Sequence, residues 1–155
     1  MKSKAMNRVL KSDVSEDAVR VFVAEDNAAD VFWLEMVFKS SRLPYVIDLA
    51  ADAASAKNYL EQFHREPNIP PKIIFLDVNL PGPDATELLD CIHAASTVPV
   101  FMISGTEVPR HLRDRVGESR CLQKPLTNSQ LLECLNSAGA LTKFDGAYQN
   151  VPSTS

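Results

Sequence analysis

Short apolar runs alternate along the chain with longer stretches in which apolar residues recur every three or four positions. The runs predict strands, and the helical spacing predicts helices between them. The expected strands span residues 19–24, 44–50, 72–77, 98–104 and 120–123. The expected helices span residues 30–40, 53–63, 85–94, 108–116 and 128–138, with Asp52 as the cap of the second.

The alternation of strands and helices determines the predicted architecture. Each strand-helix-strand step requires a parallel crossover, and strands that are apolar almost throughout require helices on both faces of the sheet. We therefore predict a doubly wound α/β fold with a five-stranded parallel sheet over residues 19–138. Residues 1–18 form a polar lead-in, and residues 139–155 form a tail that contains Phe144 and Tyr148.

The helix expected over residues 30–40 carries apolar side chains on two faces. Four residues fall at core spacing: Trp33, Leu34, Val37 and Phe38. Phe32 and Met36 fall on another face and predict exposed apolar groups one helical turn apart. Two interpretations stay open, namely loose packing beneath the lead-in and a docking surface for a partner protein.

The composition limits the chain to a few classes of protein. A length of 155 residues predicts one domain, without room for a second catalytic or DNA-binding domain. The 16 Lys and Arg residues against 20 Asp and Glu residues give a net charge of −4, which argues against nucleic-acid binding. No apolar run approaches the roughly 20 residues of a membrane helix, and no secretory signal is recognisable. Three cysteines without C-x-x-C spacing indicate reduced thiols, so we expect a cytoplasmic protein.

Polar residues follow the predicted strands at the points where the strands end. Glu25 and Asp26 follow the first strand, Asp77 ends the third, Ser104 ends the fourth, and Lys124 follows the fifth. In an open parallel sheet, ligands bind outside the carboxyl ends of the strands. We therefore expect three carboxylates, a hydroxyl and an ammonium group to gather at one edge of the sheet.

This set of groups suits phosphoryl transfer to an aspartate. Clustered carboxylates repel one another and attract a cation, and an all-oxygen cluster favours Mg²⁺. Asp77, on the central strand, is the candidate nucleophile toward phosphorus. Ser104 and Lys124 would donate hydrogen bonds to the phosphoryl oxygens. An acidic pair such as Glu25-Asp26 is by itself typical of a solvated loop, so the prediction depends on the whole set.

Four segments of the chain, in order, resemble the receiver domain of two-component response regulators. They are VFVAEDN at 21–27, FLDVNLPG at 75–82, MISGT at 102–106 and QKPL at 123–126. The resemblance covers about residues 19–138 and implies a CheY-like (βα)5 sandwich. It also implies that Asp77 is phosphorylated by a phosphohistidine on a sensor histidine kinase or a phosphotransfer protein.

The resemblance assigns roles to individual residues. It implies a Mg²⁺ site formed by Glu25, Asp26, Asp77 and the backbone carbonyl of Asn79. Ser104 would be the switch hydroxyl, Lys124 would contact the phosphate, and the peptide bond before Pro125 would be cis. Asn79 and Thr106 match the positions that tune the rate of phosphate release.

Two positions depart from the family pattern. Cys121 stands three residues before the lysine, where many receivers carry an aromatic residue that reports phosphorylation to partners. Asp84-Ala85 stands where the family usually has Asp-Gly, so the loop after Asp77 is expected to differ in shape. Neither change removes a phosphorylation residue.

A second resemblance concerns EDNAADV at residues 25–31. The segment is similar to that of stand-alone receivers which partner bacterial phytochrome-type kinases. Those receivers pair through the face made by the fourth helix, fifth strand and fifth helix, which raises the expectation of a homodimer through residues 108–138.

These observations favour a single-domain response regulator that signals through protein contacts. It would not be an enzyme, beyond catalysing its own phosphorylation and dephosphorylation. One alternative is a receiver-like interaction module that is never phosphorylated. Another is a Mg²⁺-dependent phosphohydrolase with an aspartyl-phosphate intermediate, although such enzymes usually carry a second aspartate where this chain has Asn79.

Overall fold

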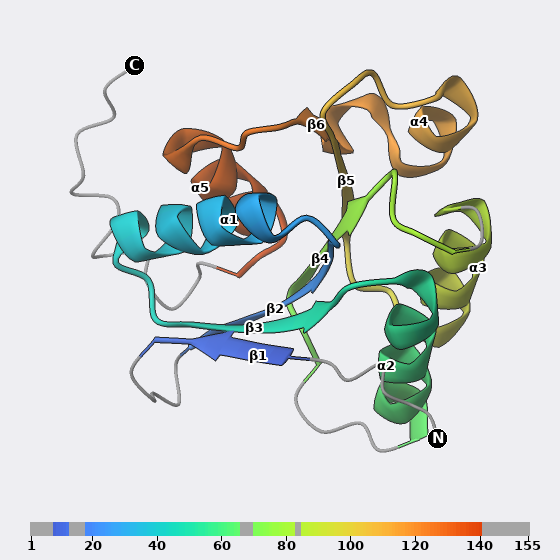
Figure 1. Ribbon diagram of the computed structural model, residues 1–155, viewed down its shortest axis with the longest axis horizontal. Helices are drawn as coiled ribbons and strands as arrows, with labels where there is room; N and C mark the ends of the chain where they lie inside the picture. The colour runs from blue at the N-terminus through green and yellow to red at the C-terminus, as the bar shows by residue number, and fades with distance from the viewer. Residues whose placement is uncertain (1–7, 13–17, 66–69, 83–84, 141–155) are drawn as a thin grey trace.

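The computed structural model describes residues 8–12, 18–65, 70–82 and 85–140, which form a sheet with helices on both faces (Figure 1). The strands are β1 (Arg8–Lys11), β2 (Val19–Ala24), β3 (Tyr45–Ala50), β4 (Ile73–Asp77), β5 (Val100–Ser104) and β6 (Cys121–Gln123). The helices are α1 (Ala28–Ser41), α2 (Ala53–Arg65), α3 (Ala85–Ala95), α4 (Arg110–Val116) and α5 (Asn128–Ser137), with a 3₁₀ turn at Glu118–Arg120.

The sheet contains the five predicted parallel strands and one additional strand. Its order is β1-β3-β2-β4-β5-β6, and β1 runs antiparallel to β3, with Val9 opposite Asp48. β1 lies within the segment that the sequence analysis interpreted as a polar lead-in. An edge strand buries little of its surface, and Val9 of β1 remains 55% exposed. The four residues of β1 therefore do not form an apolar run like those of the inner strands.

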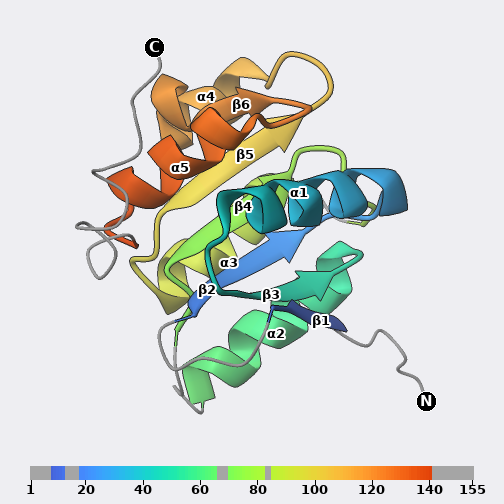
Figure 2. The same cartoon turned by 90° about the vertical axis from the view of Figure 1, so that its left-hand side faces the viewer.

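The helices form two layers that cover opposite faces of the sheet (Figure 2). Side chains alternate along β2, as expected for a strand that is covered on both faces. Val21 and Val23 pack in the cluster that includes residues of α1 and α5. Phe22 and Ala24 pack in the cluster that includes residues of α2, α3 and α4. The predicted doubly wound α/β fold is confirmed.

Side chains fix the starts of several helices. The Asn27 side chain accepts hydrogen bonds from the backbone N–H groups of Ala29 and Asp30 and begins α1. The Asp52 carboxylate accepts from the Ser55 N–H group at 2.7 Å, which confirms its predicted capping role at α2. Thr127 opens α5 with a capping box. Among the described residues, no helix is long and apolar enough to cross a membrane.

The burial of α1 agrees with the sequence analysis except at Trp33. Leu34, Val37 and Phe38 are buried, as predicted. Trp33 is 47% exposed, so its prediction as a core residue was wrong. Its indole N–H donates to the carbonyl of Leu126 at 2.8 Å, so the ring joins α1 to the segment after β6 and stays partly exposed.

Phe32 and Met36 lie on the solvent-facing side of α1. They are 63% and 40% exposed, which confirms the predicted exposed apolar face. We refer to these two residues as the α1 strip.

Candidate functional site

The functional site lies where the chain reverses its direction of travel across the sheet. β3 flanks β2 on one side and β4 flanks it on the other, so a cleft opens at the carboxyl ends of β2 and β4. Glu25 and Asp26 directly follow β2, and Asp77 is the last residue of β4. Each of the three supplies one carboxylate oxygen, and these oxygens lie within 4.8 Å of one another.

Backbone groups orient the two buried carboxylates. Glu25 and Asp77 are only 2% and 3% exposed, whereas Asp26 is exposed. One oxygen of Glu25 accepts the N–H of Asn27 at 3.1 Å. One oxygen of Asp77 accepts the N–H of Asn79, also at 3.1 Å. The adjacent loops therefore hold both carboxylates in place.

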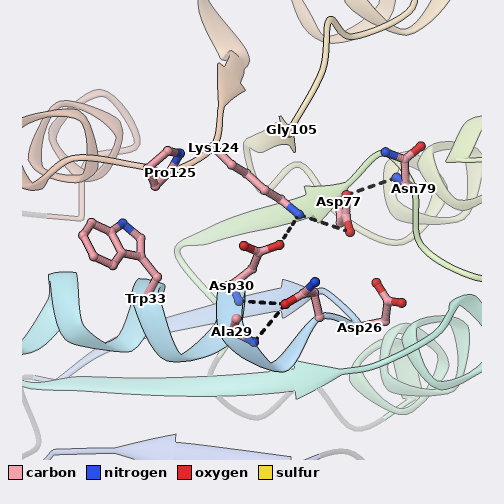
Figure 3. A pocket seen from close by; sticks show the side chains of 10 residues that line it. Asp26, Ala29, Asp30, Trp33, Asp77, Asn79, Gly105, Lys124 and Pro125 are labelled. Carbon is pink, nitrogen blue, oxygen red and sulfur yellow. Dashed lines mark hydrogen bonds and ion pairs between the residues drawn. The ribbon is translucent and has the colours of Figure 1, made fainter.

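Lys124 reaches the carboxylates from the loop after β6 (Figure 3). Its Nζ lies 2.9 Å from Glu25 Oε1, 2.8 Å from Asp30 Oδ2 and 3.5 Å from Asp77 Oδ2. The Lys124–Pro125 peptide bond is cis, as the resemblance implied. Asp30 is a site residue that the sequence pattern did not predict, because the position shows only the start of the helix expected over residues 30–40.

The electrostatics of the site leave an excess of negative charge. Burial raises the pKa of Glu25 to about 7; the Asp77 carboxylate adds to this, and Lys124 and the Asn27 N–H oppose it. Burial lowers the pKa of Lys124, but the neighbouring carboxylates of Asp30, Glu25 and Asp77 outweigh burial and raise it well above its usual value. Lys124 therefore stays charged, and its ammonium group contacts three carboxyl groups, while the Asp26 carboxylate adds a fourth to the cluster.

The donor set fits a hard divalent cation. Three carboxylates from two strand ends offer only oxygen ligands, which Mg²⁺ prefers. Asp26 is exposed, so a cation bound here would keep access to water molecules, as Mg²⁺ usually does. Asn79 also lines the cleft, beside Asp26 and Asp77.

Ser104 occupies its predicted position at the end of β5, but its hydroxyl is engaged locally. The residue is fully buried, and its Oγ accepts the N–H of Thr106 at 3.0 Å. The same Oγ lies 3.3 Å from the hydroxyl of Thr106. Gly105, not Ser104, lines the cleft. Contact between the Ser104 hydroxyl and a group bound at Asp77 would require the O–H to point away from Thr106 and toward the cleft.

The structure describes one of the two departures from the family pattern fully and the other in part. Cys121 is half-buried at the start of β6, and its thiol lies 3.6 Å from the carbonyl of Gly117. No aromatic side chain therefore stands at this position. The loop in which a change of shape is expected, at Asp84-Ala85, lies partly outside the described residues. Phe144 and Tyr148 of the tail lie outside them as well.

Comparison with sequences places the chain among signalling proteins. The family model described as "Response regulator receiver domain" matches residues 21–136. Response regulator Rcp1 of Synechocystis is 33% identical over 79 residues, which make up 50% of this chain and 54% of that protein. The transcriptional regulatory protein CpxR homolog of Haemophilus influenzae is 34% identical over 83 residues, 52% of this chain and 36% of that protein. The matched segment thus spans about half of the first relative and about a third of the second.

Comparison with solved structures shows the same fold. The bacteriophytochrome response regulator AtBRR has a TM-score of 0.63 and 22% identity, covering 79% of this chain and 94% of that one. The receiver domain of sensor histidine kinase PA1611 of Pseudomonas aeruginosa, which has a magnesium ion coordinated in its active site cleft, has a TM-score of 0.63 and 20% identity. It covers 79% of this chain and 98% of that one. Manganese-bound Rcp1 has a TM-score of 0.55 and 23% identity, over 81% of this chain and 92% of that one.

Proposed function

Because the chain belongs to the response regulator receiver family of two-component systems, we propose that Asp77 accepts a phosphoryl group in a Mg²⁺-dependent reaction. The phosphorylated form would signal through altered contacts with partner proteins. The observation that carries the proposal is the position of the Asp77 carboxylate. It is buried at the end of β4, lies within 4.8 Å of the Glu25 and Asp26 carboxylates, and lies 3.5 Å from the Lys124 ammonium.

The proposed reaction transfers phosphorus from nitrogen to oxygen. An oxygen of Asp77 attacks the phosphorus of a phosphohistidine, a new O–P bond forms, and the P–N bond breaks with its electrons returning to the imidazole. Glu25, Asp26, Asp77 and the backbone carbonyl of Asn79 would hold Mg²⁺, which would supply positive charge to the phosphoryl oxygens.

Two other groups of this chain complete the proposed chemistry. Lys124 stays charged and donates to a phosphoryl oxygen. Ser104 turns its O–H from the Thr106 hydroxyl toward the phosphoryl group and donates to it. Dephosphorylation would occur when water attacks the phosphorus of the acyl phosphate, which releases inorganic phosphate and restores the Asp77 carboxylate. The chain would therefore act on itself and not turn over a separate substrate.

We propose that the phosphodonor, a histidine kinase or a phosphotransfer protein, docks on the α1 strip. Helix α1 begins at the cleft, since Asn27, Ala29 and Asp30 line it. Phe32 and Met36 lie within the next two turns and present exposed apolar surface to a partner. Such an exchange would take place in the cytoplasm. Phosphorylation-dependent pairing of two copies through α4, β6 and α5 is the output contact that we propose to test in parallel.

The test is intact mass after incubation with Mg²⁺ and acetyl phosphate, with Asp77→Asn as control. We expect the wild-type chain to gain one phosphoryl group and the variant to gain none. Absence of the gain together with absence of Mg²⁺ binding would favour a constitutive interaction module. Sustained release of phosphate from small phosphoesters would favour a phosphohydrolase.

A further inference from the structure

Lys124 is shared among three carboxylates, and the shortest of its three contacts is with Asp30. The ammonium lies 2.8 Å from Asp30 Oδ2, in a hydrogen bond, and 2.9 Å from Glu25 Oε1. Its distance to Asp77 Oδ2 is longer, at 3.5 Å. The lysine that the reaction needs at Asp77 is therefore drawn toward α1.

Asp30 is held firmly in the position that makes this contact. Its backbone N–H donates to the side chain of Asn27 at 3.1 Å, which fixes the first turn of α1. One turn later, the indole of Trp33 donates to the carbonyl of Leu126, two residues beyond Lys124. Helix α1 is thus joined to the segment after β6 by the Trp33–Leu126 hydrogen bond and by the Asp30–Lys124 contact, the second of which is drawn in Figure 3.

We propose that Asp30 is a positioning residue that competes with phosphorylated Asp77 for Lys124 and so limits phosphorylation. This inference rests on the proposed function. The ammonium has three N–H donors, one of which is hydrogen-bonded to Asp30, and Glu25 holds the ammonium in an ion pair at 2.9 Å. Asp30 also lines the cleft, where its negative charge repels an anionic phosphodonor and attracts a cation.

A purely structural role for Asp30 predicts a different behaviour. An acidic residue in the first turn of a helix is stabilised by the helix dipole, and its loss weakens the helix slightly. That role predicts lower stability and either no change or a parallel loss in metal binding and phosphorylation. Competition for Lys124 predicts changes of opposite sign.

The test compares Asp30→Asn with wild type in two assays. At saturating Mg²⁺, we expect phosphorylation by acetyl phosphate to become about two- to fivefold faster, the factor that a partly exposed ion pair is worth. Mg²⁺ affinity, measured by calorimetry, should fall by a similar factor because one negative charge has been removed. Asp30→Glu, which keeps the charge, should return both values toward wild type.

The matched control is Asp90→Asn, which removes one carboxylate from an exposed ion pair with Arg115 on the far layer of the sheet. It should leave both assays unchanged. The Asp30→Asn effect should also persist in about 0.5 M KCl, because direct contacts are screened less than distant surface charges.

Several results would overturn the inference. Slower or unchanged phosphorylation in Asp30→Asn would show that Asp30 does not compete for Lys124. An increase in phosphorylation rate that disappears in high salt would show that Asp30 acts only as a surface charge and not through its contact with Lys124. If wild type itself gains no phosphoryl group, the proposed function fails and the inference fails with it; a normal wild type beside an unaltered variant rejects the inference alone.

Discussion

Replacement of Asp77 by Asn should stabilise the metal-free fold, although it removes the proposed phosphorylation residue. The Asp77 carboxylate is buried and lies within 4.8 Å of the carboxylates of Glu25 and Asp26. At an effective dielectric constant of about 20, each of these repulsions amounts to roughly 3.5 kcal/mol. The attraction to Lys124 at 3.5 Å amounts to roughly 5 kcal/mol. At a pH above the pKa of Glu25, which is about 7, both neighbouring carboxyl groups are ionised and the net repulsion is therefore about 2 kcal/mol.

Solvent reduces this figure because Asp26 is exposed, so we expect a gain of about 1 to 2 kcal/mol in the free energy of unfolding. The Asn side chain keeps an oxygen for the N–H of Asn79, so that hydrogen bond is retained. Urea denaturation in the presence of EDTA, at a pH above the pKa of Glu25, measures the effect. With a urea dependence of about 2 kcal/mol per M, the midpoint should rise by roughly 0.5–1 M.

Addition of Mg²⁺ should make wild type the more stable of the two proteins. Wild type gains stability by binding the ion, whereas Asp77→Asn, which lacks one proposed ligand, gains less. A variant less stable than wild type in EDTA would refute the repulsion argument. An equal response of both proteins to Mg²⁺ would refute the proposed role of Asp77 as a ligand. Asp90→Asn, at an exposed ion pair, should change the stability by less than about 0.5 kcal/mol.

Three further predictions concern two residues of α1 and the thiol of Cys134. Phe32→Lys, on the α1 strip, should slow phosphotransfer from a histidine kinase and leave phosphorylation by acetyl phosphate unchanged; equal loss in both assays would indicate misfolding and contradict docking there. Trp33→Phe should lower the free energy of unfolding by about 1 kcal/mol, because the hydrogen bond to the Leu126 carbonyl is lost; an unchanged urea midpoint, followed by circular dichroism, would contradict this. Burial raises the pKa of Cys134 to about 12, so iodoacetamide at mildly alkaline pH should label it slowly in the native protein and rapidly in urea, as mass spectrometry would show; rapid native labelling would contradict its burial.

The inner strands could be predicted from the sequence because burial on both faces leaves a clear pattern. All five residues of β4 and all five of β5 are buried, so each strand appears as an apolar run. Once the strand ends were known, parallel topology placed Glu25, Asp77 and Lys124 at one edge. Local side-chain chemistry likewise made the Asp52 cap predictable.

The features that were missed depend on contacts with distant parts of the chain or on partial burial. The ion pair of Asp30 is with Lys124, 94 residues later, and no local pattern reveals such a partner. Trp33 has core spacing, but helical periodicity does not show that its N–H meets the carbonyl of Leu126, 93 residues later. β1 was missed because an edge strand carries a weak apolar signal.

The position of β1 affects how the sheet meets other polypeptides. Without it, β3 would present six residues of unpaired backbone groups, a template on which another chain could add a strand. With it, the sheet ends in four residues on one side and in the three residues of β6 on the other. Short edges are poor templates for aggregation and for strand exchange between copies. The segment of residues 8–11 thus helps to keep the protein dispersed at high concentration, a role separate from the chemistry at the carboxyl ends of the parallel strands.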